Sequence, residues 1–269
     1  MSLDTPARHR AETDSAEDTG ARLDRSELAA MRTEMTRMMM AYKFGLDEVM
    51  TKVNILKEEF AHIHDYNPIE HVSSRLKSPA SIIAKAERLG VARDVDSIRG
   101  ALHDIAGVRI VCSFIPDIAS IQQMLARQRD VRVLEVKDYI TSPKPNGYRS
   151  LHMILETPVH LSDRVENVVV EVQLRTSAMD FWASLEHKIN YKFDGSVPDN
   201  LIAELTAAAE SANDLDLKMQ SLHQQIESLR DEDAEPSEWA AWGRLPLSTE
   251  ILRAVRNLSD GPGADSRTA

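Results

Sequence analysis

The feature of this sequence that most constrains its fold is a change of hydrophobic period after Asn67-Pro68. From there to about residue 195, runs with the pattern of strands alternate with runs whose apolar residues recur at helical spacing. The strand-like runs are 108–114, 131–136, 148–157 and 165–174, and the helical runs are 69–92, 118–129 and 177–191. This order predicts an α+β fold in which a mixed sheet is surrounded by helices.

Longer helical patterns lie on both sides of this segment, from Glu27 to His62 and over 198–233. We interpret the first, which is rich in methionine, as cover for the core or as a subunit interface. Short helices are expected over 238–242 and 249–258. The predicted organisation is a disordered tail, an N-terminal helix, a central domain, a C-terminal helical region and a second disordered tail, at 1–25, 26–65, 66–195, 196–258 and 259–269.

Charge and composition exclude several classes of protein. The net charge of −11 argues against an extended nucleic-acid-binding surface, which needs a basic face. The sequence has no apolar run near the ~18 residues of a membrane span and no signal-peptide core, so we expect a cytoplasmic protein with no membrane partner. Cys112 is the single cysteine and lies in an apolar run, where a buried core thiol is expected.

Two carboxylates stand in or beside strand-like runs. Asp104 opens the segment DIAGVRI, and Glu171 lies inside VVVEVQLRT. A carboxylate among apolar residues is unfavourable unless a cation holds it. One interpretation is a structural ion pair, for instance with Arg109 or Arg175. The other is a pair of Mg²⁺ ligands, because hard divalent ions bind carboxylates together with substrate phosphates.

Two further segments have the composition of a nucleotide site. The loop KPNGYRSLH (Lys144–His152) places Tyr148 after a glycine turn, which suits either an exposed aromatic that stacks on a base or an ordinary hairpin. The segment SIIAKAER places Ser81, Lys85 and Arg88 on one helical face. That face is either solvated or meets a triphosphate near the helix N-terminus. The sequence contains neither a Walker A motif nor GxGxxG.

Six segments in a fixed order carry a family resemblance. They are RLK, SIIAKAER, DIAGVRI, KDYITSPKPNGYRSLH, EVQLRT and FWASLEHKINYK, beginning at residues 75, 81, 104, 137, 171 and 181. Together they resemble the synthetase domain of the RelA/SpoT family in its short form, the small alarmone synthetases. The resemblance implies a nucleotidyltransferase-like mixed sheet. It also implies a homotetramer and transfer of pyrophosphate from ATP to the 3′-hydroxyl of GDP or GTP, or of GMP, which makes stringent-response alarmones.

The same resemblance implies roles for individual residues. Adenine is sandwiched by the arginines that match Arg75 and Arg109. The phosphates of ATP are held by the residues that match Lys77, Ser81, Lys85 and Arg88. Mg²⁺ is bound by the carboxylates that match Asp104 and Glu171, and Glu171 also matches the base for the 3′-hydroxyl. Guanine stacks on the aromatic that matches Tyr148, and the acceptor is further contacted by residues matching Lys144, His152 and Gln173. Asp180 stands where the residue at the guanine edge is often Asn.

The resemblance also bears on regulation. In the matching proteins an alarmone binds between subunits against a phenylalanine and lysines, and those places hold His71, Met50 and Asn54 here. We therefore expect no activation by product, unless the nearby Lys52 or Lys57 takes over. The alternatives to an enzyme are a catalytically silent guanine-nucleotide-binding regulator and a helical scaffold or RNA-binding protein. The presence of both candidate metal-binding carboxylates favours the enzyme.

Overall fold

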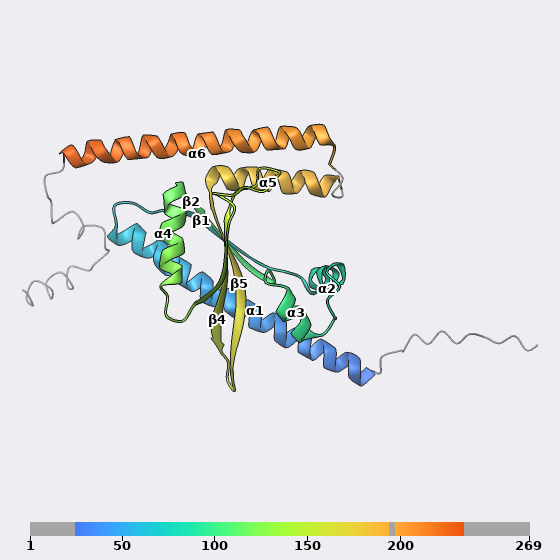
Figure 1. Ribbon diagram of the computed structural model, residues 1–269. Coiled ribbons are helices and arrows are strands. Elements are labelled where there is room, and N and C mark those ends of the chain that lie inside the picture. Colours follow the sequence, from blue (N-terminus) through green and yellow to red (C-terminus); the bar gives the residue numbers. More distant parts are fainter. Residues whose placement is uncertain (1–24, 194–196, 234–269) are drawn as a thin grey trace, which may run out of the picture.

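The computed structural model describes residues 25–193 and 197–233, which form one mixed sheet with helices packed around it (Figure 1). The strands are β1 (Ile69–Leu76), β2 (Ala106–Cys112), β3 (Arg132–Asp138), β4 (Leu151–His160) and β5 (Val165–Thr176). The helices are α1 (Arg25–Ile63), α2 (Pro79–Arg88), α3 (Val95–Ala101), α4 (Ile115–Ala126), α5 (Ser177–Lys192) and α6 (Asp199–Asp233). The predicted α+β class is confirmed.

The sheet has five strands in the order β1-β2-β5-β4-β3. The central strand is β5, which pairs parallel with β2, and every other pairing is antiparallel. Alternate residues of β5 are buried on one face, namely Val168, Val170, Val172 and Leu174. They belong to the same hydrophobic cluster as Val49 of α1 and Ile121 of α4, so the main core lies on that face of the sheet. The side chains on the opposite face are not needed for this core.

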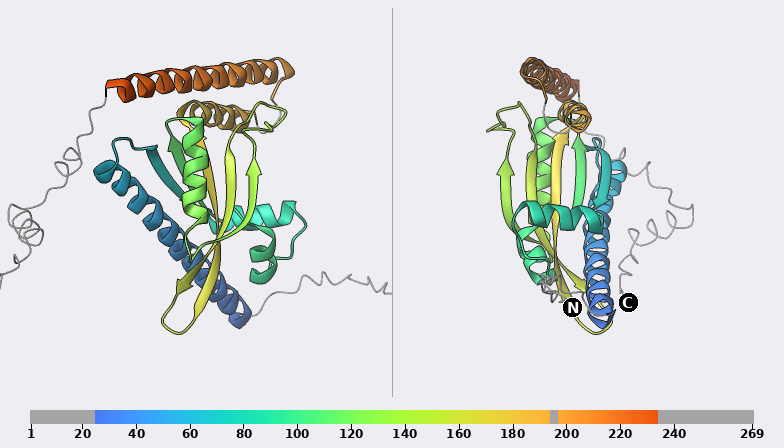
Figure 2. Two further views of the ribbon diagram at one scale, coloured as in Figure 1. Left: turned by 60° about the vertical axis from the view of Figure 1, so that its left-hand side comes forward. Right: turned by 90° about the vertical axis from the view of Figure 1, so that its right-hand side faces the viewer.

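The long helices have different positions. The first, α1, runs past the sheet on a diagonal and contacts β1, β2, β4 and β5 (Figure 2). Both α5 and α6 lie side by side at the end of the sheet where β5 leads directly into α5 (Figures 1 and 2). Thr176 caps α5 by accepting a hydrogen bond from the Met179 amide, and its hydroxyl donates to the buried Asp216 of α6. The end of β5 is therefore anchored to both helices.

One predicted helix was wrong in its first half. Residues 69–76 form the edge strand β1, and only Pro79–Arg88 is helical. The amide of Ile69 donates to the side chain of Asn67, which starts the strand, while Ser78 caps α2 and Pro79 occupies its first turn. Ile69 is the one fully buried side chain of β1. The strand therefore shows almost no apolar alternation that would have distinguished it from a helix. The helix α3 was not predicted.

The other predicted elements within the described residues are confirmed with small shifts of their ends. The predicted short helices over 238–242 and 249–258, and both tails apart from Arg25, lie outside the described residues. Cys112 is buried, as predicted, and burial raises the pKa of its thiol to about 12. Within the described ranges the chain has no helix with the length and apolar character of a membrane span.

Candidate active site

The face of the sheet opposite the core carries polar side chains. Successive strand residues point to opposite faces, so Glu171, Gln173 and Arg175 of β5 share this face. The strand register places Gln173 between Arg109 of β2 and His152 of β4. Polar residues from separate sequence segments therefore lie side by side on three neighbouring strands.

An open pocket lies between this face and α5. It is lined by Arg75, Arg109, Tyr148, Arg175, Ala183, Ser184, Glu186, His187 and Lys188. The pocket brings the two arginines expected to hold adenine together with the tyrosine expected to stack on guanine. These residues come from β1, β2 and the loop before β4, so the sheet and not local sequence assembles them.

Asp104, just before β2, is held by two lysines. Its Oδ2 accepts from Lys77 Nζ at 2.7 Å and from Lys85 Nζ at 2.6 Å. Burial favours the neutral acid, but hydrogen bonds and charge from the two lysines outweigh it and keep the pKa of Asp104 below its ordinary value. The other oxygen, Oδ1, is buried and has no hydrogen-bond partner among the described residues.

Glu171 lies in the middle of β5, where it accepts hydrogen bonds through both oxygens. His152 Nδ1 is 3.0 Å from Oε1, and Gln173 Nε2 donates to Oε2 over 3.0 Å. Burial again favours the neutral acid, but these two partners outweigh it and hold the pKa of Glu171 below its ordinary value. The negative charge of Asp104 acts on the pKa of Glu171 in the opposite direction, because a like charge favours the neutral form. Both are ionised at neutral pH.

The two carboxylates fit a divalent cation. The structure pairs neither with Arg109 or Arg175, the partners suggested from sequence. The unpartnered Oδ1 of Asp104 leaves a negatively charged, buried oxygen available. The described residues contain no cluster of three or more His, Cys, Asp or Glu side chains arranged to hold a metal. A metal here would therefore take its remaining ligands from phosphate oxygens and water, as Mg²⁺ commonly does.

The loop before β4 holds Tyr148 at the edge of the pocket. Gly147, which directly precedes Tyr148, has a φ of +86°, a left-handed conformation that turns the chain at this point. Tyr148 is half-buried, whereas a fully exposed aromatic was one of the two interpretations of the sequence. Its hydroxyl is 2.7 Å from His152 Nε2 and accepts from Arg175 Nη2 at 2.6 Å, which holds the side chain against the sheet. The ammonium of Lys144 lies 4.8 Å from its ring centroid. The ring is therefore partly accessible and has a cation over it.

Asp180, in the first turn of α5, is already engaged by two arginines. Its Oδ1 is 3.2 Å from Arg109 Nη1 and accepts from Arg175 Nη1 at 3.2 Å. The carboxylate therefore links an arginine on the adenine side of the pocket to one beside the acceptor tyrosine. In this arrangement Asp180 faces the arginines, so contact with a guanine edge would use its second oxygen or require these pairs to open.

The residues expected to grip phosphates are only partly assembled. Lys77 and Lys85 reach the site through Asp104, whereas Ser81 Oγ is 2.9 Å from Ser78 Oγ and Arg88 is exposed in the last turn of α2. Sequence reasoning gave no site role to Tyr139, whose ring lies 4.7 Å from Lys144 Nζ, and considered Arg175 only as an ion-pair partner. Arg175 is two residues after Gln173 on β5, so the period of a strand places both side chains on the same face. That period was the signal in the sequence that could have assigned Arg175 to the site.

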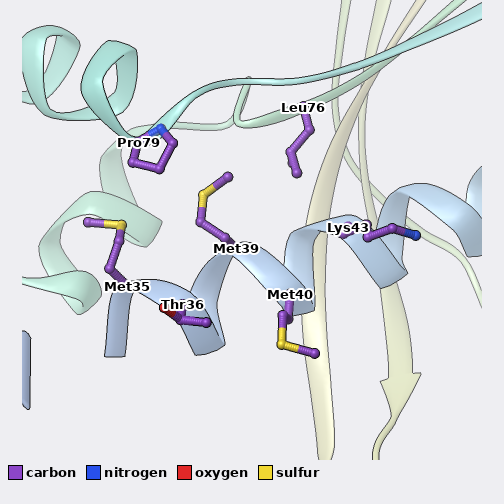
Figure 3. Close-up of a pocket in the computed structure, with 7 residues that line it drawn as sticks. All are labelled: Met35, Thr36, Met39, Met40, Lys43, Leu76 and Pro79. Atoms are coloured by element: carbon purple, nitrogen blue, oxygen red, sulfur yellow. The ribbon is translucent and has the colours of Figure 1, made fainter. Parts of the chain in front are cut away.

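A second pocket lies on the core side of the sheet, where the methionine-rich face of α1 meets the end of β1 and the start of α2 (Figure 3). It is lined by Met35, Thr36, Met39, Met40, Lys43, Leu76 and Pro79. The side chain of Met39 points toward Leu76 and Pro79 (Figure 3). This pocket is almost entirely apolar and contains none of the residues expected to bind nucleotides.

Cations, a carboxylate pair and an aromatic side chain on one face of a mixed sheet are the groups that a site for phosphoryl transfer between nucleotides requires. Residues 74–196 match the family described as the region found in RelA / SpoT proteins. GTP pyrophosphokinase YwaC of Bacillus subtilis is 49% identical over 201 residues, covering 75% of this chain and 96% of that protein.

Solved structures agree. Small alarmone synthetase 1 from Bacillus subtilis bound to its product pppGpp is 34% identical with a TM-score of 0.68, over 72% of this chain and 99% of that one. A structure of the same synthetase bound to AMPCPP is 31% identical with a TM-score of 0.63, over 72% and 98%. The chain therefore belongs to the RelA/SpoT family and, within it, to the small alarmone synthetases, which are GTP pyrophosphokinases.

Proposed function

We propose that this synthetase transfers pyrophosphate from ATP to the ribose 3′-hydroxyl of GDP or GTP, with GMP as a further acceptor. The products are AMP and the 3′-pyrophosphorylated guanosine. The observation that carries this proposal is a pair of carboxylates, of which Asp104 is bonded to two lysines and Glu171 to the Tyr148–His152 unit. A silent regulator would have no use for both Asp104 and Glu171, so the enzyme is favoured.

On the donor side, the chain supplies positive charge. Lys77 and Lys85 lie together at Asp104 and would meet the triphosphate, with Ser81 and Arg88 of α2 adding contacts when ATP binds. Arg75 and Arg109 line the pocket and would enclose the adenine. Phosphoryl transfer depends mainly on positioning and neutralisation of charge, which is what this arrangement offers.

Mg²⁺ would be held by Asp104 and Glu171 together with phosphate oxygens. When bound, it would neutralise negative charge on the phosphates of ATP. The free Oδ1 of Asp104 and the ionised state of both carboxylates support this assignment.

On the acceptor side, guanine would stack on Tyr148, and Lys144, His152, Gln173 and Asp180 would add polar contacts. Glu171 accepts the proton of the 3′-hydroxyl as that oxygen bonds to the β-phosphorus of ATP. The bond from the β-phosphorus to the α–β bridging oxygen breaks, and AMP leaves with that oxygen. His152 and Gln173 keep Glu171 ionised for this task, because both favour its charged form.

The test is to incubate the purified protein with ATP, GDP and Mg²⁺ and to measure AMP and guanosine tetraphosphate together. Glu171→Gln and Asp104→Asn are expected to abolish both products with the thermal unfolding midpoint near wild type. Glu156→Gln is a matched control, because Glu156 is also a strand glutamate paired with a cation, Arg132, but lies outside the site. A wild type that makes no AMP would refute the enzyme, and near-wild-type turnover by either variant would refute the carboxylate assignment.

Several large apolar side chains along α6 are exposed in the single chain, including Leu215, Leu222, Ile226 and Leu229. We propose that α1 and α6 form subunit interfaces in a homotetramer, which is the assembly that the family resemblance implies. Light scattering at several protein concentrations tests this, with a monomer as the contradicting result. We also propose a cytoplasmic location and, from the net charge of −11, no extended nucleic-acid binding.

A further inference from the structure

Arg175 is a buried arginine with an unusual number of polar partners. It is 5% exposed. Its Nε donates to Ser150 Oγ at 3.3 Å, and its Nη1 donates to Asp180 Oδ1 at 3.2 Å. Its Nη2 donates to both Tyr148 Oη at 2.6 Å and Gln173 Oε1 at 3.0 Å. These bonds, all within the described part of the chain, engage four of the five guanidinium N–H groups, so little donor capacity is left for a substrate.

The contacts of Arg175 close a ring of hydrogen bonds around the proposed base. Glu171 is bonded to His152, His152 to Tyr148, and Tyr148 to Arg175. From Arg175 the ring returns through Gln173 to the second oxygen of Glu171. Each oxygen of the carboxylate is therefore oriented by one arm of the ring, and both arms meet at the same guanidinium nitrogen.

The donors and acceptors of this ring are mutually consistent. Arg175 can only donate, so the hydroxyl of Tyr148 accepts from it and directs its own proton to His152 Nε2. A neutral His152 then carries its proton on Nδ1 and donates it to Glu171. In the other arm, the carbonyl of Gln173 accepts from Arg175, which leaves its amide group to donate to Glu171. The guanidinium thus sets the direction of both arms.

Arginine has the geometry for this task. One planar nitrogen with two fixed N–H groups bonds two acceptors at once, whereas a lysine ammonium is a single point on a flexible stem. Asp180 and Ser150 hold the remainder of the group in place. Loss of this fork would free Tyr148 and Gln173 to rotate even if a positive charge remained nearby.

We propose that Arg175 is a positioning residue for pyrophosphate transfer, which orients Glu171 toward the acceptor through Tyr148 and Gln173. This inference rests on the proposed function of the site. It predicts that Arg175 acts mainly on the chemical step and leaves the affinity for ATP unchanged. The affinity for GDP should fall by less than turnover does, because Tyr148 and Gln173 also contact the acceptor. A misdirected base of this kind lowers turnover by about tenfold to a hundredfold.

The first test is the division of the effect between kcat and KM in Arg175→Lys and Arg175→Gln. Both variants are expected to lose about tenfold to a hundredfold in kcat, with KM for ATP within about threefold of wild type and KM for GDP raised by a smaller factor than kcat falls. Lysine is expected not to rescue. Arg99→Lys is the matched control, since Arg99 is a partly buried arginine paired with Glu166 away from the site, and it should keep wild-type kcat. Wild-type kcat in Arg175→Lys, or a loss confined to KM, overturns the proposal.

The second test uses Tyr148→Phe, which removes the hydroxyl and keeps the ring, and which disturbs the core less than loss of Arg175. It is expected to lower kcat while leaving KM for GDP nearly unchanged. The double variant Tyr148→Phe/Arg175→Gln should be no slower than the slower single variant, because both changes break the same ring. Unchanged kcat in Tyr148→Phe, or multiplied losses in the double variant, contradicts the ring. A wild type without synthetase activity would instead refute the proposed function.

Discussion

Gly147 is the position where a single methyl group should report on the contact between the acceptor loop and α6. Its φ of +86° lies in the left-handed region, and a Cβ built there would stand 2.5 Å from the Cβ of Ala209 on α6. Ala209 is buried, and Trp182 Nε1 bonds the Leu205 carbonyl one turn earlier, so the helix cannot retreat freely. Gly147→Ala therefore meets both backbone strain and a steric clash.

The two effects can be estimated separately. A left-handed conformation is unfavourable by about 1–2 kcal/mol for a residue with a Cβ. Overpacking at a closed contact adds about 1–3 kcal/mol. We therefore expect Gly147→Ala to lower the free energy of unfolding by about 2–5 kcal/mol, with both contributions included. The displaced loop should also raise the KM for GDP more than that for ATP, because Tyr148 is the next residue.

The assay is urea-induced unfolding at one fixed protein concentration, followed by initial rates. Gly90→Ala is the matched control, since Gly90 has a φ of +67° but a Cβ there meets nothing within 4 Å. It isolates the backbone strain, so the difference between the two variants measures the clash. Adding Ala209→Gly to Gly147→Ala should recover the clash but not the strain, apart from a helix penalty of about 1 kcal/mol.

One result would refute this reasoning. If Gly147→Ala were no more destabilising than Gly90→Ala, and its KM for GDP were unchanged, the loop would not pack on α6 as the structure has it. Recovery in the double variant is the stronger test, because it depends on two residues that are distant in sequence and adjacent only through the fold.

Tyr148→Ala should raise the KM for GDP by about tenfold to a hundredfold and leave that for ATP nearly unchanged; equal losses for both would remove the stacking role. Added guanosine tetraphosphate or pentaphosphate should not stimulate initial rates, because Lys52 is paired with Asp130 and Lys57 donates to the Glu70 carbonyl; a several-fold stimulation would show a working regulatory site. Burial raises the pKa of Asp216 in the folded protein above its unfolded value of about 3.9. The stability that protonated Asp216 contributes is therefore fully present below about pH 3.9, and it is lost as the pH rises through the folded pKa. Asp216→Asn should therefore raise Tm at pH 7.5 and change it little near pH 3, whereas a lower Tm at pH 7.5 would contradict this linkage.

Several helices and strands could be predicted from local sequence, because the spacing of apolar residues within one element shows which of its side chains are buried. The apolar repeats of α1, α5 and α6 and the buried run of β2 each identified their element within a few residues. The failure at β1 has the same origin. An edge strand with one fully buried side chain has almost no pattern, and the cap at Ser78-Pro79 was the local signal that a helix begins later.

The candidate site was readable as a set of residue types. Asp104 and Glu171 stood out because a carboxylate beside an apolar run needs a partner. Which partner each one has was not predictable from sequence, and Lys77, Lys85 and His152 replaced the arginines that were suggested. The partners are set by how separate strands and α2 meet in the fold, which is a relation between segments and leaves no mark within any one of them.

The sequence by itself therefore determined the classes of the elements, the family and the side chains available for chemistry. The tertiary structure alone decided that β2 lies parallel to β5, that Asp180 links Arg109 to Arg175, and that Arg175 closes a ring around Glu171. The physical reason is that burial depends on each residue's own hydrophobicity, which the chain records locally. Hydrogen-bond direction depends on where distant segments meet, and only the folded sheet specifies that.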